Sequence, residues 1–371
     1  MATQTATVPE TMRACQIIEF NQPHQIRTIP TPSATDLKPN DLLIKIAVPS
    51  LCHSDLEYQK GVFPITLPVT ASHEGTGTVL AFGSNVKRFD VGDRVVAGQT
   101  FGRCGECEVC SGPEEYRHYC PKREAMMSVG GRNGAFQEYL VVDGREATRI
   151  PDKMSFATAA PLACAGMTAW RAVRQARLEK GQWLGIIGSG GGLGHLAIQF
   201  ARKSFGLKVV GVDARDEGLA LSREMGADLV VDARKGRDAM VEEVQKVAGP
   251  GVDAVLELSG HPSAAETGAA ITRNHARFVQ VAIADKLPVD VLQLIFKDLT
   301  ISSSFMASQA ETEAMLHAVV DHNVHVENNI FRGLDEIPRA VEMLKKAEYR
   351  GKACFVVDKD AVGVVPGDGR V

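Results

Sequence analysis

The sequence has no apolar stretch long enough to cross a bilayer, and its first nine residues, Met1 to Pro9, are small and polar. A secretory signal needs an apolar segment near the N-terminus, so we expect neither a membrane span nor a signal peptide. The net charge of −4 offers no basic surface to nucleic acid or to an anionic membrane. We therefore expect a cytoplasmic protein that acts on a small molecule.

The composition, with 44% hydrophobic and 23% charged residues over 371 positions, is that of a globular protein too long for one core. Residues 12–142 combine short apolar runs with frequent glycine and proline, which predicts a compact β domain. After Pro151 apolar strands alternate with helical intervals, which is typical of an α/β doubly wound sheet. The six expected strands are 183–187, 208–213, 228–232, 252–258, 277–283 and 299–304.

The segment after the sixth strand contains two amphipathic helices, 311–320 and 337–346, and a further strand, 352–357. Six strands already complete a doubly wound sheet, so we expect this segment to return to the first domain. The predicted division is a catalytic domain of residues 1–165 and 306–371 and a nucleotide-binding domain of residues 166–305.

A glycine-rich turn lies between the first two strands of the second domain. It comprises Gly188, Gly190, Gly191, Gly192, Leu193 and Gly194. Glycines let the backbone approach a pyrophosphate, whose charge then meets free N–H groups at the start of the following helix. Because Leu193 stands where the strict G-x-G-x-x-G pattern needs its last glycine, the run reads as G-x-x-G-x-x-G.

Asp213 ends the next strand, nineteen positions after Gly194. An acid at this spacing accepts hydrogen bonds from an adenosine ribose, and it would repel a 2′-phosphate. With strand, turn, helix and acid in order, we predict a dinucleotide site that prefers NAD to NADP. A flexible loop without a ligand is the plainer interpretation of glycines alone.

Four of the eight cysteines, Cys104, Cys107, Cys110 and Cys120, lie within seventeen residues. Four thiolates at this spacing predict a closed tetrahedral zinc site that stabilises a loop without a core of its own. Cys52, His73 and Cys164 are dispersed, and they would form a three-ligand zinc site with one open position. Spacing alone does not join these three residues. A buried cysteine or a histidine with its hydrogen bonds satisfied is a commoner role than that of a metal ligand.

These motifs occur in one order: Cys-His-Ser-Asp at 52–55, His-Glu-Gly at 73–75, the four-cysteine loop, the segment around Cys164 and the glycine turn. Together they resemble the zinc-dependent medium-chain alcohol dehydrogenases, especially the tetrameric microbial type, over residues 12 to 358. The resemblance implies an N-terminal GroES-like catalytic domain, a Rossmann coenzyme domain, two zinc ions per chain and NAD. It also implies a homotetramer, although a dimer stays open.

The resemblance assigns the catalytic zinc to Cys52, His73 and Cys164, and the structural zinc to the four-cysteine loop. Glu74 becomes a nearby or exchangeable ligand, and Asp55 orients the imidazole. Ser54 supplies a hydroxyl to the substrate oxygen, and His53 lies beside the pyrophosphate. A plain helix cap is the other interpretation of Ser54 and Asp55.

Four positions depart from the family pattern. Glu57 stands where many relatives have a histidine that passes the proton outward, and nine residues instead of seven separate Cys110 from Cys120. Lys352 stands near the position where relatives often carry an arginine against the cofactor phosphates, and a lysine there keeps the charge but lacks the bidentate fork. Gln99 or Thr100 falls where relatives place a bulky aromatic side chain in the substrate pocket.

The implied function is reversible hydride transfer between a primary or secondary alcohol and NAD, with zinc as a Lewis acid that lowers the pKa of the alcohol. A second hypothesis is a pathway-specific NAD(P)H carbonyl reductase on the same scaffold. A third is a non-catalytic relative, since a fold does not guarantee activity. The identity of the substrate is not determined by the sequence.

Overall fold

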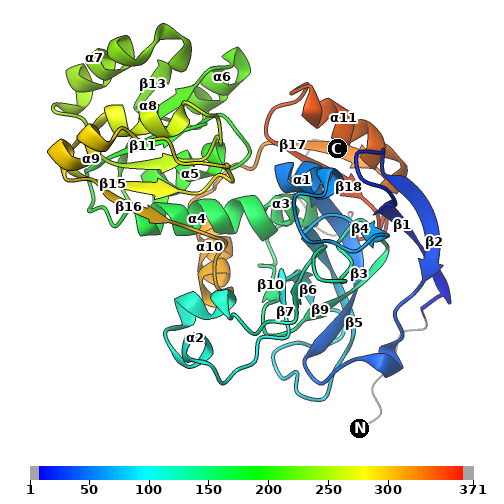
Figure 1. Ribbon diagram of the computed structural model, residues 1–371. Helices are drawn as coiled ribbons and strands as arrows, with labels where there is room; N and C mark the ends of the chain where they lie inside the picture. Colours follow the sequence, from blue (N-terminus) through cyan, green and yellow to red (C-terminus); the bar gives the residue numbers. More distant parts are fainter. Residues whose placement is uncertain (1–7, 362–371) are drawn as a thin grey trace. The chain divides into compact units, whose positions relative to one another are not determined.

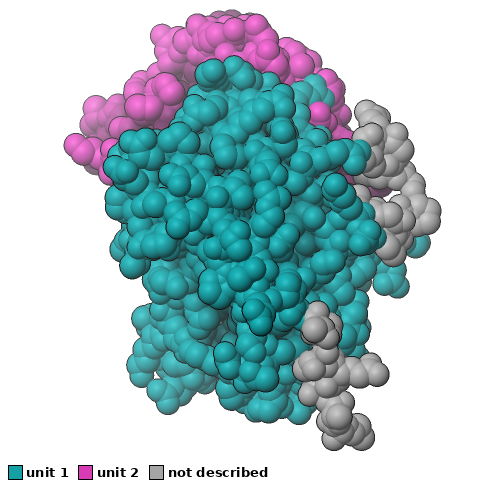
Figure 2. All heavy atoms as spheres, turned by 90° about the vertical axis from the view of Figure 1, so that its right-hand side faces the viewer, with its two compact units in different colours: residues 1–164, 308–320, 328–371 teal, residues 165–307, 321–327 magenta. Residues whose placement is uncertain are grey.

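The computed structural model describes residues 8–361 and divides the chain into two units, shown separately coloured in Figure 2. Unit 1 contains residues 8–164, Ser308–Val320 and 328–361, and unit 2 contains Ala165–Ala307 and Asp321–Glu327. The outermost parts of the expected catalytic domain, 1–7 and 362–371, lie outside the described residues. The chain therefore enters unit 1 three times.

The central strand of unit 1 is β3 (Asp41–Leu51), in which every residue except Lys45 is buried. It pairs with β5 (Glu74–Phe82) and β9 (Tyr139–Asp143), and near its end with β18 (Lys352–Val356). Because β3 itself is buried on both faces, most of its residues are apolar and they do not alternate with polar ones. The last strand of the sequence thus completes a sheet begun by the third.

The expected β domain is confirmed, and it consists of a three-stranded, a seven-stranded and a two-stranded sheet (Figure 1). The remaining strands of unit 1 are β1 (Thr11–Ile17), β2 (Gln25–Pro30), β4 (Val69–Thr70), β6 (Arg94–Val96), β7 (Thr100–Phe101), β8 (Ala125–Met126), β10 (Thr148–Arg149) and β17 (Asn328–Arg332). Its helices are α1 (His53–Lys60), α2 (Glu108–Ser111), α3 (Phe156–Pro161), α10 (Gln309–Asp321) and α11 (Ile337–Lys345).

Unit 2 is a six-stranded parallel sheet with the order β13-β12-β11-β14-β15-β16 (Figure 1). This order reverses between β11 and β14, the crevice where doubly wound sheets bind their ligands, so the predicted fold class is confirmed. The strands are β11 (Trp183–Ile187), β12 (Lys208–Asp213), β13 (Leu229–Asp232), β14 (Val252–Glu257), β15 (Thr272–Gln280) and β16 (Thr300–Ser303). The helices are α4 (Met167–Gln175), α5 (Gly194–Gln199), α6 (Asp216–Glu224), α7 (Arg237–Ala248), α8 (Ala264–Ala270) and α9 (Val291–Lys297).

The strand β17 (Asn328–Arg332) was not expected from the sequence, and two further elements differ from the expectation. β15 begins five residues before the expected position 277, because an irregularity between Val252 and Ala254 lets Val252 pair with Thr272. The helical stretch from Phe156 is interrupted by a π-helical turn, Leu162–Gly166, directly after Pro161. Proline has no N–H to donate, and such turns are frequent at functional sites. Among the described residues, no helix combines the length and apolarity that a membrane crossing requires.

His24, between β1 and β2, is 4% exposed, and in the described part of the chain neither ring nitrogen has a hydrogen-bond partner. Burial, assisted by Lys345, lowers the pKa of His24 to about 4. The folded protein therefore keeps this imidazole neutral at a pH where an unfolded chain, with a pKa near 6.5, binds a proton.

We predict that the free energy of unfolding decreases as the pH falls from about 6.5 to about 4, with His24 contributing up to ~3 kcal/mol. The sign follows because only the unfolded state takes up the proton in this window. Urea unfolding of the wild type and of His24→Leu at several pH values measures the contribution. As the pH falls, the free energy of unfolding of the wild type should decrease more than that of His24→Leu. A difference between the two proteins that is independent of pH would contradict the prediction.

Candidate functional site

Four dispersed residues of unit 1 meet at one buried point. Cys52 precedes α1 at the end of β3, His73 and Glu74 stand at the start of β5, and Cys164 lies in the π-helical turn. One ligand atom from each lies within 4.8 Å of the others, and His73 Nε2 is 3.2 Å from Cys164 Sγ. The structure therefore brings together the three ligands that spacing alone could not join, with Glu74 beside them.

The donor set suits zinc. Two thiolates and one imidazole are the ligands of a catalytic zinc site with an open fourth position. Glu74 is fully buried, and one of its carboxylate oxygens, Oε2, has no hydrogen-bond partner among the described residues. A buried carboxylate oxygen beside two sulfurs is unfavourable unless a cation is close by. The residues present therefore fit the expected metal ion.

The other oxygen of Glu74, Oε1, lies 2.8 Å from Lys352 Nζ, and both side chains are at most 5% exposed. Burial alone would lower the pKa of Lys352, but the negative charges of Glu74, Cys52 and Cys164 outweigh it and hold that pKa above its ordinary value. Lys352 is thus a permanent cation within the anionic cluster. The structure shows its ammonium group held by Glu74. The expected contact of Lys352 with cofactor phosphates stays a prediction.

Asp55 connects the two chain segments that bear Cys52 and His73. Its carboxylate accepts one hydrogen bond from the N–H of Cys52 and another from the N–H of Ser72, both at 2.9 Å. Burial raises the pKa of Asp55 to about 7 and outweighs the charge of His73, which acts to lower that pKa. The resemblance suggested that Asp55 orients the imidazole, whereas the structure directs both of its oxygens to the backbone.

The hydrogen-bond partner of His73 Nδ1 in the described chain is the hydroxyl of Tyr58, at 3.4 Å. Sequence reasoning missed Tyr58. The one available signal was its place three residues after Asp55, which puts both side chains on the same face of α1.

The remaining expected residues of this site lie close by. Ser54 is half-buried, with Oγ 3.9 Å from Cys52 Sγ, and His53 is exposed at the start of α1. Glu57 pairs with Lys60 one helical turn later, at 2.8 Å. The amide of Gln99, expected in a substrate pocket, instead donates to the carbonyl of Ala163 at 2.7 Å. Gln99 therefore supports the backbone beside Cys164.

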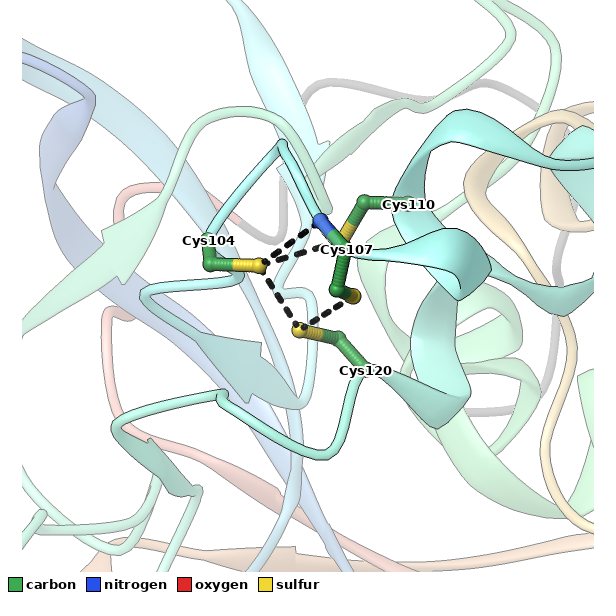
Figure 3. Close-up of side chains that lie close together, drawn as sticks. All are labelled: Cys104, Cys107, Cys110 and Cys120. Carbon is green, nitrogen blue, oxygen red and sulfur yellow. Dashed lines mark hydrogen bonds between the residues drawn. The ribbon is translucent and has the colours of Figure 1, made fainter.

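The four cysteines of the second cluster surround one point (Figure 3). Their Sγ atoms are 3.9 Å apart in the pairs Cys104–Cys110 and Cys107–Cys120, and 3.7 Å apart in Cys104–Cys120. Sulfurs bound at 2.3 Å around a tetrahedral zinc are separated by about 3.8 Å, whereas a disulfide would bring them to about 2 Å. Backbone N–H groups of Glu106 and Cys107 lower the pKa of Cys104 to about 6, which favours the ligating thiolate.

The longer gap before Cys120 forms a 3₁₀ turn, Glu114–Tyr119, that is anchored outside the loop. The carboxylate of Glu114 accepts hydrogen bonds from Ser308 Oγ at 2.6 Å and from the N–H of Ala310 at 3.2 Å, at the start of α10. The insertion therefore leaves the four sulfurs together and connects their loop to a distant part of the sequence.

The glycine turn of unit 2 follows β11, and α5 begins at its last glycine. A side-chain carbon on Gly190 would lie 2.1 Å from the carbonyl oxygen of Gly218, and one on Gly194 would lie 2.3 Å from that of Gly188. These two positions therefore require glycine for close packing. Gly191, Gly192 and Leu193 are only half-buried, so their backbone is accessible to a ligand.

Asp213, at the end of β12, is 6% exposed and contacts the same turn. Its Oδ2 accepts the N–H of Gly190 at 3.0 Å, and its Oδ1 accepts the N–H groups of Ala214 and Arg215 at 2.9 and 3.0 Å. The predicted acid is thus bonded directly to the glycine turn, and its contact with a ribose stays a prediction.

Comparisons with known proteins cover both units. Residues 38–152 match the alcohol dehydrogenase GroES-like domain, and residues 192–321 match the zinc-binding dehydrogenase domain. The chain is 32% identical over 317 residues to an alcohol dehydrogenase of Schizosaccharomyces pombe, with 84% of this chain and 89% of that protein covered.

Two solved structures are similar over nearly their whole length. An alcohol dehydrogenase from the hyperthermophilic archaeon Aeropyrum pernix has 28% identity and a TM-score of 0.83, with 93% of this chain and 99% of that chain covered. A cinnamyl alcohol dehydrogenase from Sorghum bicolor has 26% identity and a TM-score of 0.82, with 93% and 97% covered.

We predict that the purified protein contains two zinc ions per chain, one for each ligand cluster. Cys164→Ser should lower the content to about one, because serine is a poor ligand for a borderline-soft ion. Cys107→Ser should also remove one ion, and in addition destabilise the loop that the structural site holds. Elemental analysis after dialysis measures this, and a zinc content that neither substitution changes would show that the clusters do not bind the metal.

Proposed function

Because the chain belongs to the zinc-dependent medium-chain alcohol dehydrogenase family, we propose that it catalyses reversible hydride transfer between a primary or secondary alcohol and NAD. The family makes the protein an oxidoreductase of the alcohol dehydrogenase type that works with zinc and a nicotinamide cofactor. The observation that carries the proposal is the meeting of Cys52, His73 and Cys164 around one buried point beside Glu74.

Zinc held by these three residues would supply a Lewis acid that lowers the pKa of an alcohol oxygen. Ser54 Oγ, 3.9 Å from Cys52 Sγ, is close enough to the ligands to hydrogen-bond the substrate hydroxyl and accept its proton. A bound nicotinamide would supply the hydride acceptor, so that loss of one proton and one hydride from the alcohol would give a carbonyl. Glu57 follows Ser54 by one turn of α1 and pairs with Lys60 at 2.8 Å, and its carboxylate is the group that we propose receives the proton next.

Asp213 supports NAD as the cofactor. The carboxylate already bonds the backbone of the glycine turn, so it is held where it would meet the ribose. A 2′-phosphate there would face a negative charge, which disfavours NADP. Arg215, with Nε 3.4 Å from Asp213 Oδ1, is positioned to contact such a phosphate once the acid is removed.

We further propose that the protein works in the cytoplasm as a homo-oligomer, with a tetramer suggested by the resemblance. Apolar side chains gather on α9, where Val291, Leu292, Ile295 and Phe296 are 60–76% exposed. Within residues 8–361, the neighbouring β16 is an edge strand whose one partner is β15. An exposed apolar patch beside an open edge is typical of an interface, and a second copy would bury both.

We predict that the zinc-loaded protein reduces NAD with a panel of alcohols and oxidises NADH with the matching carbonyl compounds. Nicotinamide absorbance follows the reaction, and NADP should support it at least about tenfold less well, since one repelled phosphate costs above 1 kcal/mol. Cys164→Ser should reduce turnover about a thousandfold, because the lost Lewis acid is worth several kcal/mol.

Asp213→Ser serves as the matched control, because it leaves the metal ligands intact. It should bring the activity with NADP closer to the activity with NAD. The comparison of both reaction directions separates an alcohol dehydrogenase from a carbonyl reductase. If the zinc-containing protein changes the nicotinamide absorbance in neither reaction direction, the proposed activity is wrong and the hypothesis of a non-catalytic relative is supported.

We predict that Phe296→Glu dissociates the oligomer while the active-site residues stay unchanged. A buried charge in an apolar contact is strongly unfavourable, whereas the same side chain costs little at a surface that is already exposed. Light scattering after size exclusion should show a lower mass for the variant than for the wild type. A wild-type protein that elutes as a monomer at micromolar concentration would contradict the prediction.

A further inference from the structure

The hydroxyl of Tyr58 lies directly behind the predicted metal ligand His73. Oη is 3.4 Å from Nδ1, and the tyrosine and imidazole rings meet edge to face, with centroids 5.8 Å apart and an interplanar angle of 81°. Tyr58 is 5% exposed and His73 is 4% exposed, so no solvent molecule competes freely for this contact.

The orientation of the imidazole determines which nitrogen carries the hydrogen. Nε2 faces the thiolates, 3.2 Å from Cys164 Sγ, so it is the atom that would meet the metal and it must be unprotonated. The hydrogen of the neutral ring then resides on Nδ1, which points toward Tyr58. A buried N–H needs an acceptor, and the tyrosine oxygen is the partner within the described chain.

We propose that Tyr58 is a positioning residue for the catalytic metal site: its hydroxyl oxygen accepts the Nδ1–H of His73 and so sets the tautomer and the ring orientation of that ligand. The inference rests on the proposed function in taking Cys52, His73 and Cys164 as the zinc ligands. It divides the role that the resemblance gave to Asp55 between two residues of α1.

The division follows from the contacts. Both oxygens of Asp55 hold backbone N–H groups, of Cys52 and Ser72, and thereby position the ligand-bearing segments. Tyr58 acts on the ring itself and is in turn held by Phe63, whose ring lies edge to face at 5.0 Å. A neutral hydroxyl withdraws less proton density from the imidazole than a carboxylate would, so the ring is a weaker electron donor to the ion. The metal consequently keeps more of its positive charge.

The test is the release of zinc from the holoprotein to a competing chelator, followed with a colorimetric zinc indicator. Cys164→Ser identifies the phase that belongs to the catalytic site. Tyr58→Phe keeps the ring and its packing against Phe63 but leaves the Nδ1–H without an acceptor. We expect it to accelerate the catalytic phase 10- to 100-fold, the range found when an outer partner of a metal-bound histidine is removed.

Two controls separate positioning from general loosening. The four-cysteine site in the same molecules should release its zinc at the wild-type rate. Tyr349→Phe deletes a second hydroxyl next to the same core cluster as Tyr58 and should change neither phase. With cobalt in place of zinc, Tyr58→Phe alone should shift the visible absorption of the Cys₂His site, since these bands respond to ligand geometry.

Release within twofold of the wild type by Tyr58→Phe, or equal acceleration by Tyr349→Phe, would overturn the proposal. Both readouts are independent of any substrate. A protein without dehydrogenase activity whose catalytic zinc still depends on Tyr58 would refute the proposed function and leave this inference standing.

Discussion

The structure of the metal site depends on two hydrogen bonds accepted by one buried carboxylate. Asp55 receives the N–H of Cys52, where β3 passes into α1, and the N–H of Ser72, immediately before β5. The β3–β5 ladder, with Ser50 opposite Glu74, already brings these strand ends together, and Asp55 joins the segments that leave the ladder. Because the side chain is fully buried, both bonds are made where water cannot replace them.

Charge balance explains why such a polar cluster can be buried. Of the groups that face the expected ion, Cys52 and Cys164 as ligating thiolates and Glu74 as a carboxylate would carry three negative charges, and Lys352 supplies one positive charge at 2.8 Å from Glu74. A divalent ion would provide the other two. Buried charges are stable only when they are paired, so an ion bound here would stabilise the fold as well as supply the chemistry. Lys352 can reach the cluster because its strand, β18, pairs with the end of β3.

Other polar side chains near the expected sites also hydrogen-bond to the backbone. Gln99 holds the carbonyl before Cys164, and Glu114 connects the four-cysteine loop to the start of α10. Asp213 was expected to contact a cofactor ribose, and its carboxylate accepts a hydrogen bond from the glycine turn itself. Gln99 and Asp213, which were expected to face the substrate and the cofactor, both bond to backbone groups. Polar groups in a buried site need partners, and the nearby backbone is the partner most often available.

The sequence alone determined the strands of the doubly wound sheet, the glycine turn with Asp213, and the four-cysteine loop, because each depends on local periodicity or on ligands close together in the chain. Tertiary structure decided the rest. The bulge at Val252 that lengthens β15 depends on a neighbouring strand, and the union of Cys52, His73 and Cys164 depends on sheet register and a π-helical turn. The preference of Asp55 for backbone and of Tyr58 for the imidazole could not be predicted, since a hydrogen bond is decided by distances of tenths of an ångström between residues that the chain brings together only when folded.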